Sequence, residues 1–300
     1  MFGQFSRLTF EALLTAGYDV CAVVVPAPPG THNHDGPPLR QVVRPWSRSE
    51  LTIINPHVVS SIVTQAWERN IPVFEFGQPR AAEVVATLGT LAPDLGCVAC
   101  FSQRIPPTLL KLPRFGFWNV HPALLPAHRG PEPLFWVFRT GDEPGVTVHI
   151  MDEELDTGPI ILQSPLTLPD GLSGMEAERR CALLGGQLLV AAMERLGRNE
   201  LQPQPQSGQP SYAPYPAPID FTLSTTWSAR RVFNFMRGTA EWGMPYSLDV
   251  TEQHFSLRAA IDYSLDEVLG VPYQQAGSQV RFQFTPGTLV AQIDDREGAN

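Results

Sequence analysis

The first half of the chain alternates helical segments with short, wholly apolar runs. Helical spacing of apolar residues predicts a helix over Phe5–Ala16, and Val20–Val25 is a continuous apolar run typical of a buried strand. Short strands that are apolar on both faces and separated by helices are typical of a parallel sheet covered by helices on both sides. The sequence therefore predicts an α/β fold with a mostly parallel sheet. Further helices are expected near Val58–Trp67, Arg80–Leu88, Leu134–Phe138 and Met175–Leu196, and further strands at Ile71–Phe76, Gly96–Phe101, Phe115–Val120 and Val146–Met151, with a loop over 26–49.

A proline-rich segment divides the chain. Residues 201–218 hold six prolines in eighteen positions, which excludes a regular helix or a central strand and predicts an extended linker. After it, Trp227–Arg237 fits a helix, and short alternating runs between Pro245 and Ile293 predict strands. We therefore expect a first domain over residues 1–200 and a small, mostly β domain over residues 219–300.

Composition narrows the class of protein. Charged residues make up 17% of the 300 residues, against about a quarter in an average protein, whereas the hydrophobic fraction of 43% is ordinary. This composition excludes a disordered chain and indicates a folded globular protein. Lys111 is the single lysine, and the net charge of −9 argues against a general binder of nucleic acid or anionic membranes. Because no apolar run reaches membrane-spanning length and the start lacks signal-peptide features, we expect a cytoplasmic protein. The four scattered cysteines are expected to be reduced.

Residues 117–163 carry the clearest chemistry. An apolar strand delivers Asn119 and His121, two positions apart and so on one face, to the carboxyl end of the sheet, where α/β proteins place ligands. The next strand leads into an acidic turn that contains Asp156. Together, these groups suit acyl transfer to an amine: the amide donates to the developing oxyanion, the imidazole moves protons, and the carboxylate keeps the imidazole protonated. No activated Ser or Cys nucleophile is evident, so we expect direct attack by the amine.

Other candidate groups have simpler interpretations. Cys97 and Cys100 have the CxxC spacing of redox and metal sites, but positions i and i+3 of a strand face opposite sides, so we interpret them as core residues. His32 and His34 lie in a Pro/Gly-rich loop without a third spaced ligand, and no metal site is expected. His149 lies within a strand and is interpreted as a structural or cleft-lining residue.

Three motifs of the central segment resemble the folate-dependent formyltransferases: NVHPALLPAHRG at 119–130, GVT at 145–147 and LDTG at 155–158. That family includes methionyl-tRNA formyltransferase, glycinamide ribonucleotide formyltransferase, the amino-sugar formyltransferases and the hydrolase domain of 10-formyltetrahydrofolate dehydrogenase. The resemblance implies a Rossmann-like catalytic domain that uses 10-formyltetrahydrofolate without a metal, with Asn119, His121 and Asp156 as the catalytic residues. It also implies a pterin pocket lined by Ser102, Gln103, Arg104 and Ile105, and folate contacts from Ala123, Leu124, Leu125 and Pro126.

Both ends of the chain depart from the family pattern. Family members begin with an apolar strand before a Gly-x-x-Phe turn, and only Met1 and Phe2 precede the matching segment Gly3-Gln4-Phe5. We therefore expect the first strand to be missing, with a misassigned start codon as the preferred explanation. Members with two domains carry a small β-barrel after the linker. About 80 residues follow Asp220, so we expect a β-barrel-like domain that is incomplete.

The sequence leaves the identity of the amine acceptor open. The two-domain layout and the restart at Ile219-Asp220-Phe221 favour methionyl-tRNA. Residues 220–300, however, contain six arginines and no lysine against ten acidic residues, whereas a tRNA-binding domain needs a basic face. A nucleotide-linked amino sugar or another small amine fits an acidic domain better. Hydrolysis of 10-formyltetrahydrofolate, with water in place of the amine, and a non-catalytic folate-binding remnant are the remaining alternatives.

Overall fold

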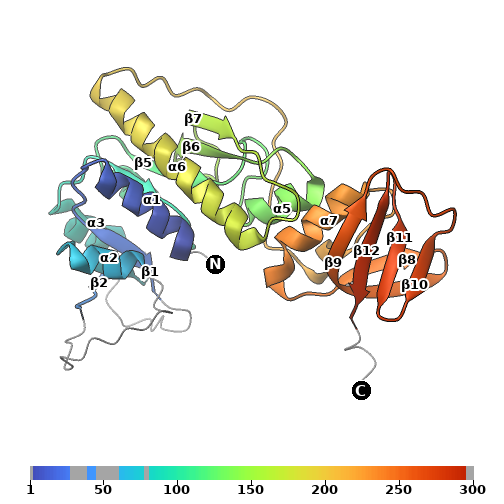
Figure 1. The fold of residues 1–300 in the computed structure, drawn as a ribbon. Coiled ribbons are helices and arrows are strands. Elements are labelled where there is room, and N and C mark those ends of the chain that lie inside the picture. The colour runs from blue at the N-terminus through green and yellow to red at the C-terminus, as the bar shows by residue number, and fades with distance from the viewer. Residues whose placement is uncertain (1–2, 28–38, 45–60, 78–80, 295–300) are drawn as a thin grey trace. The chain divides into compact units, whose positions relative to one another are not determined.

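The chain forms two compact units that do not follow chain order. The computed structural model describes residues 3–27, 39–44, 61–77 and 81–294 (Figure 1). Unit 1 takes Met1–Pro126, Val146–Ser164 and Cys181–Gly208, and unit 2 takes Ala127–Gly145, Pro165–Arg180 and Gln209–Asn300. The proline-rich segment is thus shared between them, with its first part in unit 1 and the rest in unit 2.

Unit 1 is built on two small sheets, one ordered β1-β3-β2 and the other β4-β5-β6-β7. The strands are β1 (Val23–Pro26), β2 (Leu39–Gln41), β3 (Val73–Phe76), β4 (Gly96–Val98), β5 (Phe117–His121), β6 (Gly145–Ile150) and β7 (Ile160–Pro165). The helices that belong to unit 1, wholly or in part, are α1 (Gly3–Thr15), α2 (Ile62–Glu68), α3 (Ala81–Gly89), α4 (Pro107–Leu110) and α6 (Gly174–Gly197).

The predicted alternation of helices and strands is confirmed in this unit, with two kinds of exception. The short elements β2, α4 and β7 were not predicted, and β2 lies within the expected loop over 26–49. His32, His34 and the start of the helix expected near Val58 lie outside the described residues.

The expectation of a mostly parallel sheet was wrong, because both sheets are mixed. β1 runs parallel to β3 and β4 parallel to β5, whereas β2 is antiparallel to β3 and β6 is antiparallel to β5. The physical reason lies in the connections. Between β5 and β6 the chain leaves unit 1 for residues 127–145, so the intervening helix does not form the crossover over the sheet that parallel neighbours require.

Helices cover both faces of the first sheet, as predicted. On one face, Phe10 of α1 and Ala66 of α2 pack with Val23 and Val73 of the strands. On the other face, the side chains of α3 and α4 pack against Phe76, with Val24 and Phe74 at the margin of the cluster. Successive strand residues point to opposite faces, so an apolar run such as Val23–Pro26 contributes to both clusters.

Two glycines bring α6 close to its neighbours in unit 1. A Cβ at Gly185 would lie 2.3 Å from a methyl carbon of Val120 in β5, and a Cβ at Gly186 would lie 2.7 Å from the Cβ of Ala12 in α1. Larger residues would therefore push α6 away from the strand that carries Asn119 and His121. The absence of side chains at 185 and 186 is what allows this helix to support β5.

Unit 2 is an antiparallel sheet of order β10-β11-β12-β9-β8 with helices packed on it. Its elements are α5 (Pro133–Thr140), the 3₁₀ helices η1 (Pro218–Phe221) and η2 (Ala240–Trp242), α7 (Ala229–Gly238), β8 (Tyr246–Val250), β9 (Gln253–Ser264), β10 (Tyr273–Ala276), β11 (Gln279–Gln283) and β12 (Thr288–Ile293). A single aromatic-rich core joins α5 to α7 and the sheet through Phe135, Phe221 and Phe235. Among the described residues no pairing closes β8 onto β10, so the sheet is open.

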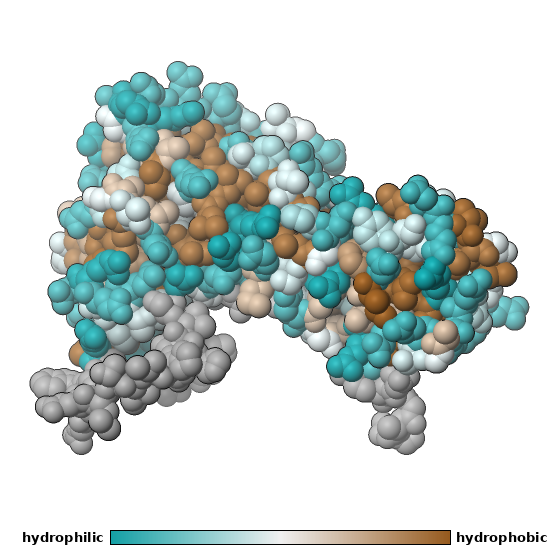
Figure 2. Space-filling view, viewed as in Figure 1, coloured by the Kyte–Doolittle hydropathy of each residue, from teal (hydrophilic) through white to brown (hydrophobic). Residues whose placement is uncertain are grey.

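On the face shown in Figure 2, hydrophobic residues on the surface gather over the sheet of unit 2 and also along α6. Met175 and Leu183 are two of the exposed large side chains of this helix. Within the described part of the chain, no helix combines the length and hydrophobicity needed to cross a membrane.

Candidate active site

Strand β5 presents Asn119 and His121 on one face of the second sheet. The residues between and beside them, Trp118 and Val120, are buried on the opposite face. The antiparallel partner β6 places His149 opposite Asn119 and Thr147 opposite His121. Because facing residues of paired strands point to the same side, four polar side chains gather on this face.

The Asp156 carboxylate completes the group predicted from the sequence. Its Oδ1 accepts a hydrogen bond from Asn119 Nδ2 at 3.2 Å, and its Oδ2 lies 3.6 Å from His121 Nδ1. The side chains of His121 and Asp156 are only 4% and 6% exposed, so water screens the electrostatic interaction between them only weakly. The structure thus brings together Asn119, His121 and Asp156.

Asp156 holds a backbone conformation that most residues avoid. Its φ is 55°, in the left-handed region where Asn and Asp are tolerated better than other non-glycine residues. Gly158, two residues later, could not carry a side chain, because a Cβ there would lie 1.9 Å from the carbonyl oxygen of Ile150. The turn therefore approaches the end of β6 closely, and this approach directs the carboxylate to the polar face.

His149 is a fourth member of the group. Its Nε2 lies 3.3 Å from Asp156 Oδ1 and 3.2 Å from Asn119 Nδ2, and its Nδ1 lies 3.0 Å from the carbonyl oxygen of Ile150. A carbonyl only accepts, so Nδ1 carries a proton. In the neutral ring Nε2 then accepts from Asn119, and in the protonated ring it donates to Asp156. The sequence signal for this role was the alternation of Thr147 and His149 along β6, but the pairing with β5 was needed to interpret it.

The Asn119 amide is held within this network. Its nitrogen faces both Asp156 and His149, so donation to a developing oxyanion requires one of these hydrogen bonds to be released.

Gln206, in the proline-rich segment, anchors the acidic turn. Its side-chain amide donates to the backbone oxygen of Asp156 at 2.8 Å and to that of Gly158 at 2.9 Å. One side chain thus satisfies two carbonyls on either side of Thr157. Sequence reasoning treated residues 201–218 as a linker and missed this contact, because a glutamine between prolines carries no local sign of its partner.

Side chains of β6 and β7 hold the loop after His121 in place through hydrogen bonds to its backbone. Thr147 Oγ1 donates to the Ala123 carbonyl at 2.7 Å and accepts from the Leu125 amide at 3.2 Å. Gln163 Nε2 donates to the Leu125 carbonyl at 2.9 Å and to Thr147 Oγ1 at 2.8 Å. Ala123 and Leu125 are buried, whereas Leu124 and Pro126 are half-buried. The loop therefore turns its polar backbone inward at 123 and 125 and leaves Leu124 and Pro126 partly accessible.

The other segment expected to bind the folate, residues 102–105, is tied to the acidic turn. Arg104 donates to the backbone oxygen of Glu153, and Gln103 Nε2 donates to the Phe76 carbonyl at 3.2 Å. Ser102 is exposed, whereas Ile105 is buried in the core cluster that includes Phe76. The structure thus places Arg104 beside the turn that holds Asp156, while the Ile105 side chain supports the core.

Comparisons with known proteins place this arrangement in context. Residues 54–193 match the family described as formyl transferase. A methionyl-tRNA formyltransferase of Pelotomaculum thermopropionicum is 34% identical over 240 residues, which cover 80% of this chain and 70% of that protein. Another, from Synechococcus sp., is 38% identical over 197 residues, which cover 65% of this chain and 60% of that protein. The chain therefore spans 60 to 70% of the length of these two relatives.

A solved structure shares the fold over nearly the whole chain. The N-formyltransferase of Helicobacter canadensis, crystallised with folinic acid and dTDP-3-aminofucose, superimposes with a TM-score of 0.64 at 14% identity and covers 97% of each chain.

Proposed function

The chain belongs to the formyl transferase family, and on that basis we propose that it transfers a formyl group from 10-formyltetrahydrofolate to a primary amine. The observation that carries the proposal is the convergence of Asn119 and His121 on the Asp156 carboxylate, whose oxygens lie 3.2 Å from Asn119 Nδ2 and 3.6 Å from His121 Nδ1. We propose residues 1–200 as the catalytic domain, 201–218 as the linker and 219–300 as the accessory domain.

The three side chains have complementary roles in this proposal. Attack of the amine on the formyl carbon places negative charge on the formyl oxygen and positive charge on the nitrogen. Asn119 donates to the oxygen, and His121, as an imidazolium, donates to it or returns the proton to the leaving nitrogen. Asp156 stabilises the imidazolium across 3.6 Å and takes up the proton released by the amine, directly or through water.

The surface that we assign to the co-substrate offers carbon to the faces of a ring system and polar groups to its edge. 10-Formyltetrahydrofolate supplies the formyl group when bound. In the loop over 123–126, the bonds to Thr147 and Gln163 satisfy the backbone groups at 123 and 125, so the partly accessible Leu124 and Pro126 present mainly carbon to a ligand. Ser102, Gln103 and Arg104, on the segment that is bonded to the acidic turn through Arg104, would supply polar contacts.

For the acceptor we propose methionyl-tRNA, the substrate in the names of the curated relatives. The acidic character of residues 220–300 favours a second candidate, a small amine such as a nucleotide-linked amino sugar, because six arginines against ten acids give little attraction for a polyanion.

One assay compares the candidates. Release of tetrahydrofolate is followed by absorbance with 10-formyltetrahydrofolate and, in turn, charged initiator tRNA, amino-sugar nucleotides and no amine. Turnover that depends on charged tRNA supports the first acceptor, and turnover that depends on a sugar nucleotide supports the second. Equal formate release with and without amines would instead indicate a hydrolase. Folate binding without turnover under any condition would refute the proposed activity and leave a non-catalytic remnant.

A further inference from the structure

Three polar atoms of the proposed catalytic group form a nearly equilateral triangle. Asn119 Nδ2 lies 3.2 Å from Asp156 Oδ1 and 3.2 Å from His149 Nε2, and the last two atoms lie 3.3 Å apart. Seen from Asn119 Nδ2, the other two atoms are therefore about 60° apart, whereas the two N–H bonds of an amide diverge by about 120°. Asn119 can consequently align only one N–H with this pair of neighbours.

The side of the triangle between His149 and Asp156 indicates where the protons lie. Nδ1 of His149 carries a proton, because it faces the Ile150 carbonyl at 3.0 Å. In a neutral ring, Nε2 would then be a bare acceptor 3.3 Å from a carboxylate oxygen, in a side chain that is only 1% exposed. Two acceptors that face each other away from water repel each other. A proton on Nε2 turns the same contact into an ion pair.

The buried Asp156 carboxylate also needs a cation beside it. Arg104, the arginine at the acidic turn, donates instead to the backbone oxygen of Glu153. Two imidazoles lie at ion-pair distance from Asp156, those of His121 and His149. His121 has to give up and regain its proton in the proposed reaction, so it cannot supply a constant positive charge. His149 has no such task.

We propose that His149 is the resident imidazolium of the site, a positioning residue that keeps its proton throughout turnover and acts through Asp156. The catalytic consequence of this inference rests on the proposed function, whereas the protonation of the ring does not.

The other titratable groups around His149 are compatible with a charged ring. On β5, His121 lies edge-on to it, with the ring centroids 6.3 Å apart. In the acidic turn, Asp152 is directed at the turn itself, since its Oδ1 accepts from the Thr157 hydroxyl at 2.7 Å. On β7, the polar side chain that faces β6 is the uncharged Gln163. The charges that act on His149 at close range are therefore those of Asp156 and His121.

With His149 charged, Asp156 remains ionised even while His121 is neutral. When His121 is protonated as well, each ring is attracted to the carboxylate, across 3.3 Å and 3.6 Å, and the rings repel each other across 6.3 Å. At equal dielectric constant each attraction is nearly twice the repulsion, because the Coulomb energy falls as the reciprocal of distance. Both rings can therefore be protonated at once, and the net positive charge of the group favours a developing oxyanion.

Protonation of His149 also fixes the direction of the Asn119 amide. Because Nε2 then no longer accepts, one N–H of Asn119 donates to Asp156 Oδ1 and the other points about 120° away from that bond. This second N–H is available to the formyl oxygen. The hydrogen bond that has to be released for catalysis is thus the one to His149, and the proton on the ring releases it.

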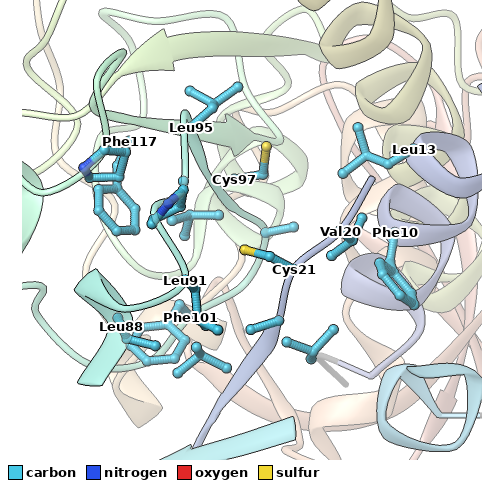
Figure 3. Close-up of a pocket in the computed structure, with 18 of the residues that line it drawn as sticks. Phe10, Leu13, Val20, Cys21, Leu88, Leu91, Leu95, Cys97, Phe101 and Phe117 are labelled. Atoms are coloured by element: carbon cyan, nitrogen blue, oxygen red, sulfur yellow. The ribbon is translucent and has the colours of Figure 1, made fainter. Parts of the chain in front are cut away.

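An apolar groove between β1 and β4 in unit 1 supplies a control. Its volume is about 570 Å³, Phe10 and Leu88 line it, and the polar side chains of the catalytic group do not (Figure 3). Cys97 lines it with an exposed side chain, because β4 is an edge strand among the described residues, so the sequence-based interpretation of Cys97 as a core residue was wrong. The apolar walls nevertheless raise the pKa of its thiol to about 12 through desolvation. Cys97 pairs with Trp118, whose side chain lies on the face opposite the catalytic group, so Cys97→Ser changes the same sheet without altering that group.

The state of the ring can be measured directly, without substrate. Histidine labelled with ¹⁵N in the ring is incorporated into the chain, and His149 is assigned among the seven histidines by the loss of its signals in His149→Gln or His149→Phe. Near neutral pH, where a histidine can take either form, we expect both ring nitrogens of His149 to carry a proton. A bare Nε2 in the folded protein overturns the proposal, whether or not the protein turns over any acceptor.

Kinetics test whether the charge acts through Asp156. His149→Gln keeps a side chain that can donate to Asp156 but removes the charge. We expect kcat to fall by at least about thirtyfold and KM to change by less than about threefold, because a carboxyl without its cation is partly protonated and no contact with the substrate is lost. In the Asp156→Asn background the same change should lower kcat by less than about threefold, since no carboxylate charge is left to support. Cys97→Ser should leave the kinetics unchanged.

The remaining outcomes also discriminate. Equal losses in both backgrounds would show that His149 does not act through Asp156, and an unchanged kcat in His149→Gln would show that its charge is not used; either result overturns the proposal. If His149→Gln does not fold, the ring state of the unaltered protein decides. If the unaltered protein turns over no acceptor, the proposed function fails, and the ring state still tests this inference.

Discussion

Replacement of Asp156 by asparagine tests the mechanism most directly. The substitution keeps the size of the side chain and suits the backbone, because asparagine is among the residues that best tolerate the φ of 55° at this position. The hydrogen bonds that Gln206 donates to the turn involve backbone oxygens and are unchanged. Asp156→Asn therefore removes the charge and leaves the fold in place.

The size of the effect follows from the distance between the charges. A unit charge on Asp156 interacts with an imidazolium 3.6 Å away by about 4 to 5 kcal/mol at an effective dielectric constant of about 20. If this stabilisation is used in the transition state, its loss lowers kcat by about three orders of magnitude. That value lies within the range of about 10² to 10⁴ typical of general acid–base groups.

The assay measures kcat by tetrahydrofolate release and the affinity for folinic acid, a stable folate, by titration. We expect a loss in kcat of about 10³ with folate affinity changed by less than about threefold, because the carboxylate contributes little contact area. Asp142→Asn is the matched control, since Asp142 also pairs with a histidine, His128 at 2.8 Å, but belongs to unit 2 and is not a member of the proposed catalytic group. Turnover of Asp156→Asn within about threefold of the original, or an equal loss in both variants, would refute the assigned role.

Three further changes probe the surroundings. Gln206→Leu leaves two carbonyls of the acidic turn without their donor, which should destabilise the turn by about 1 to 3 kcal/mol and lower kcat more than it raises KM. Gln204→Leu is the control and should leave the kinetics unchanged, because the Gln204 side chain bonds only to the Gln202 carbonyl among the described contacts. Gly158→Ala forces a Cβ against a backbone oxygen and should lower the free energy of urea unfolding by at least about 2 kcal/mol; an unchanged midpoint would contradict the packing described above. Burial and the nearby Glu178 raise the pKa of the Glu132 carboxyl in the folded protein from 4.5 to about 7. As pH rises, this carboxyl therefore loses its proton in the unfolded chain before it does so in the folded protein. The free energy of unfolding should consequently fall between about pH 4.5 and pH 7. Glu132→Gln should remove that part of the pH dependence, and an identical stability profile in both proteins would argue against it.

Local patterns in the sequence were sufficient to place most elements of unit 1. Apolar runs such as Val20–Val25 and the amphipathic spacing of Met175–Leu196 correspond to β1 and α6 within a few residues. The short elements β2 and α4 escaped because three or four residues carry too little periodicity to distinguish them from a loop. The direction of β6 escaped for a different reason: it depends on the path of residues 127–145, which no pattern within β6 encodes.

In the site, too, local patterns placed some residues and long-range contacts placed the others. Asn119 and His121 could be placed on one face because strand side chains alternate with a period of two, and the motif around Asp156 resembled a known family. Their partners could not be placed in this way. His149 faces Asn119 only because β6 pairs with β5 in antiparallel register, and Gln206 reaches the turn across fifty residues of sequence.

The sequence alone thus determined the order of helices and strands and the chemical groups available for formyl transfer, because both depend on neighbours within a few residues. Only the tertiary structure decided which strands pair, how the carboxylate is held among two imidazoles and an amide, and that a groove lies between β1 and β4. These features depend on contacts between segments far apart in the chain, whose formation is governed by packing and chain connection rather than by local propensity.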